Sequence, residues 1–469
     1  MFRSMSAAAV ALATATFAQG AGAADLTSDQ AAFRGLYKEL VEINTTLSSG
    51  SCTAAAQAMA TRLKAAGYAD ADIRILAPAE RRKDGNLIAV LPGTDRKAKP
   101  ILLLAHIDVV EAKREDWERD PFTLVEENGY FYGRGASDDK AMAAALTDAM
   151  IRYKTEGFKP RRGLKLALTC GEETPDEFNG VAWLLANHPD ALDAEFALNE
   201  GAGGRVDAAG KPVFLGIQAG EKVYQDFQLE ATNPGGHSSR PVKDNAIYHL
   251  AGAISRLAAY DFPVAINEAT RGHFEAMAGI EGGQSAADLK AAAAGDAEAI
   301  ARVAQDPSRN SMMRTTCVAT MVDAGHAPNA LPQRARANVN CRILPGESIE
   351  SVKARLEEVF ADPAVKVTTV GEPSPVTPPP PLSAKIVGPA KAVAAELWPG
   401  LPLVPAMATG ATDGRFTNAA GVATYGLSGM LGDTDGNGAH GLNERIRVKS
   451  LYDGREFLYR VVKLYANQR

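Results

Sequence analysis

The residues of this chain that could do chemistry are histidines, aspartates and glutamates gathered in short segments. The segments are His106-Ile107-Asp108, Asp138-Asp139, Glu172-Glu173, Glu200 and His440-Gly441. Imidazole nitrogens and carboxylate oxygens are ligands that zinc takes in proteins, and a pair of zinc ions needs a bridging carboxylate and an open position for water. The segments therefore contain the ligands for two zinc ions, with carboxylates left over for proton transfer.

Most of these segments follow short apolar runs that are typical of strands buried on both faces of a parallel sheet. Residues 101–105 precede His106, 164–169 precede Glu172, 194–198 precede Glu200, and 422–427 lead into the loop that reaches His440. In open α/β sheets, ligands bind in the crevice beyond the carboxyl ends of the strands. We therefore expect the acidic residues and the two histidines to converge at one edge of a sheet.

The composition limits the classes of molecule that the protein is expected to bind. The chain has 469 residues, of which 46% are apolar and 23% charged, so it can bury a large core and is long for one domain. Its formal charge is -6 and it has no long basic run. This argues against nucleic acid or an anionic membrane as the main partner and favours a small-molecule substrate.

Two different patterns of expected strands and helices along the chain predict two domains. Strands and helices alternate up to about residue 220, as in a doubly wound α/β unit, whereas the following part combines half-exposed strands with helices. A stiff proline-rich run at 373–382 then precedes a return of the α/β pattern. We therefore expect an α/β catalytic domain at 24–220 and 376–469, with an α+β domain at 221–375 inserted into it. The Ala-rich helices at 281–302 are interpreted as surface decoration of the second domain.

The amino terminus has the pattern of a secretory signal. Arg3 precedes an apolar stretch, and Ala21-Gly22-Ala23 gives the small residues that favour cleavage. We expect residues 1–23 to be a signal peptide and the mature protein to be exported, either periplasmic or secreted. No later segment has the length and apolar character of a membrane span.

Four cysteines, Cys52, Cys170, Cys317 and Cys341, allow three disulfide pairings, and the sequence alone does not choose among them. Cys317 and Cys341 both lie in strand-like stretches of one region, which favours their pairing. We interpret Cys170 as a small buried residue. The absence of any CxxC spacing argues against a thiolate zinc site.

Each candidate segment also has a simpler interpretation. Asp138-Asp139 precedes a helix expected to begin near Lys140, where one carboxylate could cap the helix. Glu172-Glu173 has the composition of a solvated helix start. Two carboxylates buried together repel each other unless a cation lies between them, so the metal interpretation explains both pairs at once.

His106 and Asp108 lie two residues apart and share one face of an extended strand. We expect the Asp108 carboxylate to accept the second imidazole N–H of His106, which fixes the tautomer of a metal-binding histidine. A plain hydrogen-bonded His–Asp pair is the alternative.

Six stretches in order along the chain resemble the M20 family of metallopeptidases. They are His106–Asp108, Gly133–Lys140, Gly171–Glu173, Asn199–Gly201, Gly235–Ser239 and His440–Glu444. The resemblance covers essentially the whole chain after the signal. It implies a zinc-exopeptidase-like catalytic domain with an inserted lid and dimerisation domain. Residues 117–135 and the long insertion look most like the carboxypeptidase S branch.

The resemblance also assigns roles to the metal-binding residues. Asp138 matches the bridging ligand of two zinc ions, for which cobalt or manganese could substitute. His106 and Glu200 would complete one metal site, and Glu173 and His440 the other. The peptide between Asp138 and Asp139 is expected to be cis. Asp108 would orient His106, and Glu172 would remain unligated and act as general base and then general acid.

The predicted second domain contains further residues with expected roles in catalysis or substrate binding. His237 lies in a glycine-rich turn, where an exposed turn histidine is the simple interpretation. In the resembling family this histidine reaches the partner subunit's site and polarises the scissile carbonyl, which implies a homodimer. Asn329 and Arg342 resemble substrate-binding residues, and the Arg342 guanidinium suits a carboxylate. Residues 410–415 resemble a family segment but differ at Ala411 and Gly414.

The predicted function is cleavage of an amide bond in peptides that carry a free C-terminal carboxylate, as by a carboxypeptidase or dipeptidase. An N-acyl-amino-acid amidohydrolase is the alternative within the enzymes. A non-catalytic solute-binding relative is a different class, but such relatives normally lose a ligand or the base, and none is missing here.

Overall fold

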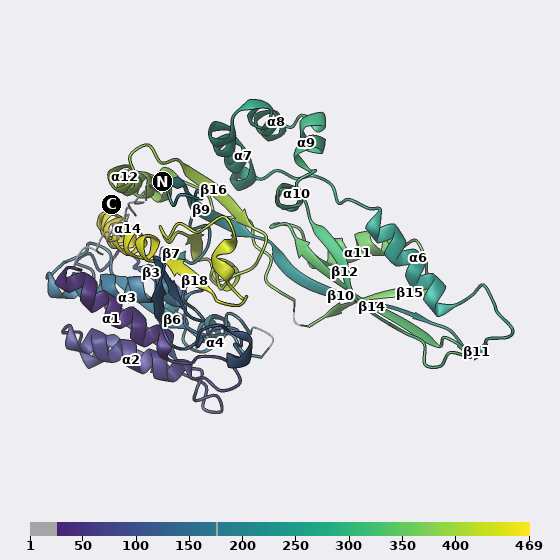
Figure 1. Ribbon diagram of the computed structural model, residues 1–469, viewed down its shortest axis with the longest axis horizontal. Coiled ribbons are helices and arrows are strands. Elements are labelled where there is room, and N and C mark those ends of the chain that lie inside the picture. Colours follow the sequence, from purple (N-terminus) through teal and green to yellow (C-terminus); the bar gives the residue numbers. More distant parts are fainter. Residues whose placement is uncertain (1–25, 175–176, 372) are drawn as a thin grey trace, which may run out of the picture.

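The computed structural model describes residues 26–469 apart from 175–176 and 372. It has two bodies, a larger one that contains both the first described helices and the C-terminus, and a narrower one built on a second sheet (Figure 1). The signal peptide predicted at residues 1–23 lies outside the described residues. Within the described part of the chain, no helix has both the length and the apolar character needed to cross a membrane.

The larger body is built on a nine-stranded sheet in the order β1-β2-β6-β3-β7-β17-β9-β16, with β8 paired to β9. Its central strands β6, β3, β7 and β17 are parallel. The strands are β1 Ile73–Leu76, β2 Asn86–Leu91, β3 Ile101–His106, β6 Leu164–Thr169, β7 Phe196–Asn199, β8 Arg205–Val206, β9 Pro212–Glu221, β16 Leu403–Ala408 and β17 Ala423–Gly426.

Helices cover both faces of this sheet, which is why its central strands are apolar at almost every position. Alternate residues of β3 enter different cores: Leu103 packs with the first group of helices, and Leu104 packs with the second. The first group is α1 Ser28–Glu42, α2 Cys52–Ala65, α3 Lys140–Thr155, α12 Ala384–Leu397 and α14 Val448–Asn467. The second is α4 Gly180–Asn187, α5 Pro189–Leu192 and α13 Gly414–Ala419.

The narrower body is a four-stranded antiparallel sheet in the order β12-β14-β10-β15 with its own apolar core. The strands are β10 Val223–Thr232, β12 Thr316–Ala324, β14 Arg334–Ile343 and β15 Val365–Val370, and α6 Ala246–Ala258 and α11 Ile349–Phe360 pack on them. A two-stranded ribbon, β11 Gly236–His237 with β13 Ala330–Leu331, lies at the end remote from the larger body (Figure 1). The predicted α/β fold with an inserted α+β domain is confirmed; the residue limits given for the domains stay a prediction.

A small three-stranded sheet contains a hairpin that turns at Asn128-Gly129. Both turn residues have positive φ, 52° and 79°, as a tight hairpin turn between these strands requires. The strands are β4 Val125–Glu127 and β5 Tyr130–Tyr132, and β18 Arg445–Arg447 pairs with β5.

The Ala-rich helices pack differently from the prediction. The predicted stretch 281–302 corresponds to α8 Gly283–Ala293 and α9 Ala297–Val303, which lie between α7 Glu268–Glu281 and α10 Pro307–Met313. Their apolar faces form a cluster with Val404 of β16 and Phe214 of β9, and His273 Nδ1 lies 2.9 Å from the Pro405 carbonyl oxygen. Of these helices, α7 packs on the edge strand β16, α8 packs on α7, and α9 packs on α8, so the predicted stretch is attached to the larger body. Their amphipathic pattern shows that one face is buried but not which strand buries it.

Both disulfides are formed. Cys317 pairs with Cys341, as predicted. Cys52 pairs with Cys170, so the interpretation of Cys170 as merely a small buried residue is wrong. The two residues are 118 positions apart in sequence, and they meet because the start of α2 packs beside the end of β6. No local pattern in the sequence indicates that contact.

Candidate active site

The candidate segments converge at the carboxyl edge of the central strands. His106 is the last residue of β3, Glu172 and Glu173 follow β6, and Glu200 follows β7. Asp138 lies just before α3, and His440 comes from the loop that precedes β18. The residues therefore meet at the edge of the sheet that the strand pattern predicted.

The metal-binding candidates form two groups that share Asp138. In the first group, His106 Nε2 lies 3.1 Å from Asp138 Oδ1 and 3.8 Å from Glu200 Oε1. In the second, His440 Nε2 lies 3.2 Å from Asp138 Oδ2 and 2.9 Å from Glu173 Oε1. Asp138 thus turns one oxygen to each group, which is the arrangement of a carboxylate that bridges two cations.

The buried carboxylates of the site would be stabilised by bound cations. Burial raises the pKa of Glu200 and of Asp139 well above the usual range, and the nearby Asp138 carboxylate adds to both shifts. Burial opposes ionisation of Asp138 too, but His106 and His440 hold its pKa well below the usual range. Hydrogen bonds to Asp138 and Glu173 raise the pKa of His440 to about 10. Because so many carboxylates gather around two imidazoles, the donor set fits a pair of metal ions.

Glu172 is placed for proton transfer. Among the described residues it belongs to neither of the two groups that share Asp138. Burial raises the pKa of its carboxyl well above the usual range, and the neighbouring Asp413 and Glu173 add to the shift against the opposing effect of His106. A carboxylate with a raised pKa beside a metal site can accept a proton from water and later release it.

Asp108 orients the site, but not in the way that strand alternation predicted. His106 Nδ1 lies 3.1 Å from the backbone carbonyl oxygen of Asp108 and 3.6 Å from its carboxylate. The carboxylate instead accepts the backbone N–H groups of Glu172 at 3.3 Å and of Glu173 at 3.0 Å. The reason is that β3 ends at His106, so the alternation of an extended strand no longer applies at Asp108.

A second carboxylate, which the sequence showed only as part of a resembling stretch, fixes the loop before Asp138. The fully buried Glu444 accepts hydrogen bonds from Arg134 Nη1 at 2.8 Å and from the backbone N–H groups of Gly135, Ser137 and Asp138 at 2.8–3.0 Å. The peptide between Asp138 and Asp139 in this loop is cis, as expected. Glu444 therefore positions the backbone of Asp138.

Replacement of Glu444 by alanine is expected to lower the free energy of unfolding by about 3–5 kcal/mol, because it leaves the Arg134 guanidinium buried without its partner. The measurement is urea denaturation followed by circular dichroism. Glu298→Ala, at a side chain that is 90% exposed, serves as the control and is expected to change stability by less than about 0.5 kcal/mol. Similar stabilities for the two variants would contradict the positioning role.

Asp413, in the segment that resembles the family at residues 410–415, contacts the residues on either side of the Glu172-Glu173 loop. Its buried carboxylate accepts hydrogen bonds from Thr169 Oγ1 at 3.0 Å and from Asn179 Nδ2 at 2.6 Å. Asn179 Nδ2 also donates to the Gly171 carbonyl oxygen at 3.2 Å. Asp413 therefore supports the backbone that leads into Glu172, a contact across 234 residues that local sequence patterns do not reveal.

The remaining candidates lie outside this cluster within one chain. His237 is exposed in β11, at the remote end of the narrower body (Figure 1), and Asn329 lies beside it, its carbonyl oxygen accepting the Ser238 N–H at 3.1 Å. Arg342 pairs with Tyr224 at the start of β10, next to the crossing between the bodies, and its guanidinium lies 4.6 Å from the Tyr224 ring centre. A single chain thus assembles the metal ligands without His237.

Comparisons with known proteins agree with the geometry. The family model described as Peptidase family M20/M25/M40 matches residues 102–464. The chain is 28% identical over 386 residues to the N-fatty-acyl-amino acid synthase/hydrolase PM20D1 of Mus musculus, covering 80% of this chain and 75% of that one. It is 29% identical over 387 residues to the probable carboxypeptidase S-like 2 of Dictyostelium discoideum, covering 79% and 72%.

A solved structure shares the whole architecture. The M20 family metallo-carboxypeptidase Sso-CP2 of Sulfolobus solfataricus superposes with a TM-score of 0.69 at 19% identity, covering 94% of this chain and 100% of that one. The resemblance seen in the sequence is confirmed by the family match, which spans well over half of the chain. The protein belongs to the M20 peptidase family and is an enzyme of the peptidase and amidohydrolase type, which hydrolyses C–N amide bonds.

Proposed function

We propose that the protein is an exported hydrolase with two zinc ions that cleaves the amide bond of peptides with a free C-terminal carboxylate. The observation that carries the proposal is the pair of ligand groups sharing Asp138, with the Glu172 carboxylate, which belongs to neither of them, beside His106 and Glu173. Hydrolysis of N-acyl amino acids is the second candidate. The similarity to an N-fatty-acyl-amino acid synthase/hydrolase favours it, and it requires the same site.

The chain's own residues divide the proposed reaction between them. When bound, the metal ions polarise the scissile carbonyl and lower the pKa of water. Glu172 accepts the proton that the attacking water loses and delivers it to the leaving amine. Asp108 holds the backbone of Glu172 and Glu173, and its carbonyl oxygen accepts the Nδ1–H of His106, so that Nε2 would be left to bind a metal ion. Arg342 would bind the substrate carboxylate, and Asn329 its carbonyl.

A homodimer would bring His237 to the partner's site, where it would stabilise the oxyanion. The support comes from β12, an edge strand of the narrower body with large exposed apolar side chains. Val318 is 59% exposed, Met321 70% and Val322 63%. An unpaired strand edge with apolar side chains favours association with another chain, and a second copy is the simplest partner.

Hybrid dimers test whether His237 acts across subunits. His237→Ala and Glu172→Gln are each expected to be nearly inactive alone. A hybrid of the two retains one complete site, with Glu172 from one subunit and His237 from the other, so an equal, fully exchanged mixture should recover about a quarter of wild-type activity. The measurement is turnover before and after subunit exchange, with two copies of the same variant mixed as the control. No recovery despite demonstrated exchange would contradict the shared site.

A substrate panel separates the two candidate activities. Matched pairs would share the same C-terminal amino acid and differ in whether an aminoacyl group or a fatty acyl group is attached to its nitrogen. Release of the amino acid from dipeptides supports the peptidase, whereas release only from acylated substrates would replace it by the N-acyl-amino-acid hydrolase. Release from neither class, with zinc supplied, would contradict the proposed function.

Export is supported by the signal-like residues 1–23 and by two disulfides, which persist in oxidising compartments. Expression with the native amino terminus is expected to give a periplasmic or secreted protein that begins at Ala24. Mass spectrometry of the intact protein checks the cleavage site. A chain that retains residues 1–23 and stays in the cytoplasm would contradict export.

A further inference from the structure

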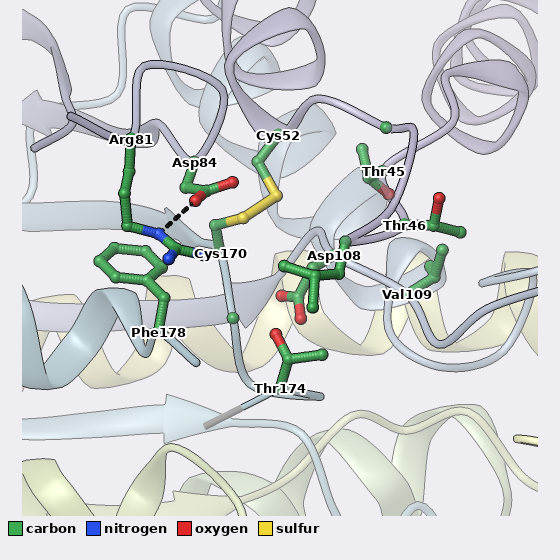
Figure 2. A pocket seen from close by; sticks show the side chains of 13 residues that line it. Thr45, Thr46, Cys52, Arg81, Asp84, Asp108, Val109, Cys170, Thr174 and Phe178 are labelled. Carbon is green, nitrogen blue, oxygen red and sulfur yellow. Dashed lines mark hydrogen bonds and ion pairs between the residues drawn. A yellow bond between two sulfur atoms is a disulfide. The ribbon is translucent and has the colours of Figure 1, made fainter. Parts of the chain in front are cut away.

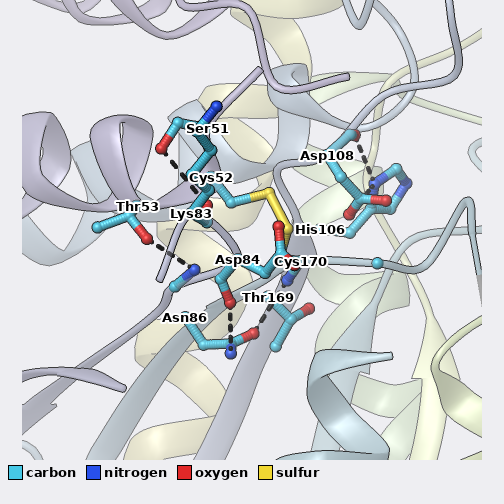
Figure 3. Close-up of a disulfide and its surroundings, with 12 residues drawn as sticks. Ser51, Cys52, Thr53, Lys83, Asp84, Asn86, His106, Asp108, Thr169 and Cys170 are labelled. Carbon is cyan, nitrogen blue, oxygen red and sulfur yellow. Dashed lines mark hydrogen bonds and ion pairs between the residues drawn. A yellow bond between two sulfur atoms is a disulfide. The ribbon is translucent and has the colours of Figure 1, made fainter. Parts of the chain in front are cut away.

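The Cys52–Cys170 disulfide lies immediately before the loop that carries Glu172 and Glu173. It joins the first residue of α2 to the residue that follows β6, and only Gly171 separates Cys170 from Glu172. A carboxylate oxygen of Asp108 lies within 4.8 Å of both sulfur atoms, and Figure 3 shows the bond together with Asp108 and His106. Both cysteines are buried, with 2% and 5% of their surfaces exposed.

The Cys52 end of the bond belongs to a rigid part of the larger body. The neighbouring Thr53 donates its backbone N–H to the Lys83 carbonyl oxygen at 2.9 Å, and its hydroxyl donates to the Arg82 carbonyl oxygen at 2.7 Å. The same hydroxyl accepts the Gly85 N–H at 2.8 Å. The start of α2 is therefore fixed to the segment that leads into β2 (Figure 3).

The Cys170 end connects this fixed point to the catalytic loop. The Cys170 N–H donates to Asn86 Oδ1 at 3.0 Å, and its carbonyl oxygen accepts the Gly180 N–H at 2.7 Å. Beyond it, the loop is fastened to Asp108 through the backbone N–H groups of Glu172 and Glu173. The disulfide is thus the covalent bond in a short chain of contacts that runs from α2 to Glu172, the proposed base.

Side chains do not completely fill the space beside the disulfide. A small cleft lies between the disulfide and the loop, lined by side chains that include Cys52, Cys170, Asp108, Thr174 and Phe178 (Figure 2). The covalent link adds to the hydrogen bonds that hold the loop, and it fixes Cys170 to the start of α2.

We propose that the Cys52–Cys170 disulfide is a positioning element of the active site, which holds Glu172 for proton transfer and Glu173 for metal binding. The inference rests on the proposed hydrolase function. Cys52 lies before residues 102–464, which the family model matches, so one end of this link comes from outside the matched segment. Loss of the disulfide should therefore lower turnover. It should also weaken metal binding by the group that contains Glu173 more than metal binding by the group that contains Glu200.

The test compares two double variants of the full chain. Cys52→Ala/Cys170→Ala removes the link, and Cys317→Ala/Cys341→Ala removes the disulfide between β12 and β14 as the matched control. The first is expected to lower kcat by about tenfold or more, since small misplacements of reacting groups are costly, with KM changed by less than about threefold. Zinc titration by equilibrium dialysis should show the second ion bound about 10- to 100-fold more weakly. The control should match the wild type in both measurements.

Each result bears on the proposal separately from the proposed function. A Cys52→Ala/Cys170→Ala variant with the kcat and zinc affinity of the control would overturn the positioning role. So would a variant that does not fold, as judged by circular dichroism, since the bond would then be needed by the fold as a whole. Failure of the wild type to hydrolyse any amide would reject the proposed function, whereas the zinc titration would still test the disulfide.

Discussion

Replacement of Glu172 by glutamine is expected to lower kcat by about 10²- to 10⁴-fold, the usual contribution of a general acid–base. The amide of glutamine has nearly the size of the carboxylate but cannot accept the proton from water. Because Glu172 lies in neither ligand group that shares Asp138, the variant should bind as much metal as the wild type. It should also be at least as stable, since burial and the neighbouring Asp413 and Glu173 already disfavour the charged carboxylate.

The measurement is kcat and metal content on the same preparation. Glu177→Gln, an exposed position in the same loop region, is the matched control and is expected to keep wild-type turnover. Activity of Glu172→Gln close to that of the control would remove Glu172 as the base. Loss of metal from Glu172→Gln would instead assign this carboxylate to the ligands.

Replacement of Asp138 by asparagine is expected to abolish turnover, by more than about 10³-fold, through loss of metal. Among the described residues, only Asp138 belongs to both of these ligand groups: its Oδ1 lies 3.1 Å from His106 Nε2, and its Oδ2 lies 3.2 Å from His440 Nε2. Asparagine offers one oxygen and no charge, so it cannot bridge two cations in the same way. The variant should therefore hold about one metal ion or none where the wild type holds about two.

Metal content after dialysis, measured by plasma mass spectrometry, checks this expectation. Asp70→Asn is the control, because its side chain is 87% exposed and pairs only with Lys64 at the surface. Two tightly bound ions in Asp138→Asn would contradict the bridging role. Loss of activity with full metal content would indicate instead that Asp138 acts on the substrate and not through metal binding.

The sequence predicted the parts of the site that depend on local patterns. Apolar runs marked the strands that end at His106 and before Glu172 and Glu200, and the residue types at their ends marked the ligands. The structure brings these residues together with Asp138 and His440 in the predicted grouping. Local patterns suffice here because a parallel sheet gathers the ends of its strands at one edge.

Contacts between distant parts of the chain could not be predicted in the same way. Glu444 reaches the Asp138 backbone across 306 residues, and Cys52 reaches Cys170 across 118. The packing of α7 against β16 likewise depends on which strand forms the sheet edge. Asp108 differs for a local reason, because the strand ends two residues before it. In each case the sequence shows the residue type, but the residue that it contacts is determined only by the complete fold.

The most direct test of the two-metal site is a crystal structure of the protein grown with zinc, with anomalous diffraction recorded at the zinc edge. Two peaks about 3.5–4 Å apart are expected, one among His106, Asp138 and Glu200 and the other among Asp138, Glu173 and His440. Asp138 should contact both peaks, and Glu172 neither. A single peak, or peaks that lie away from Asp138, would contradict the account.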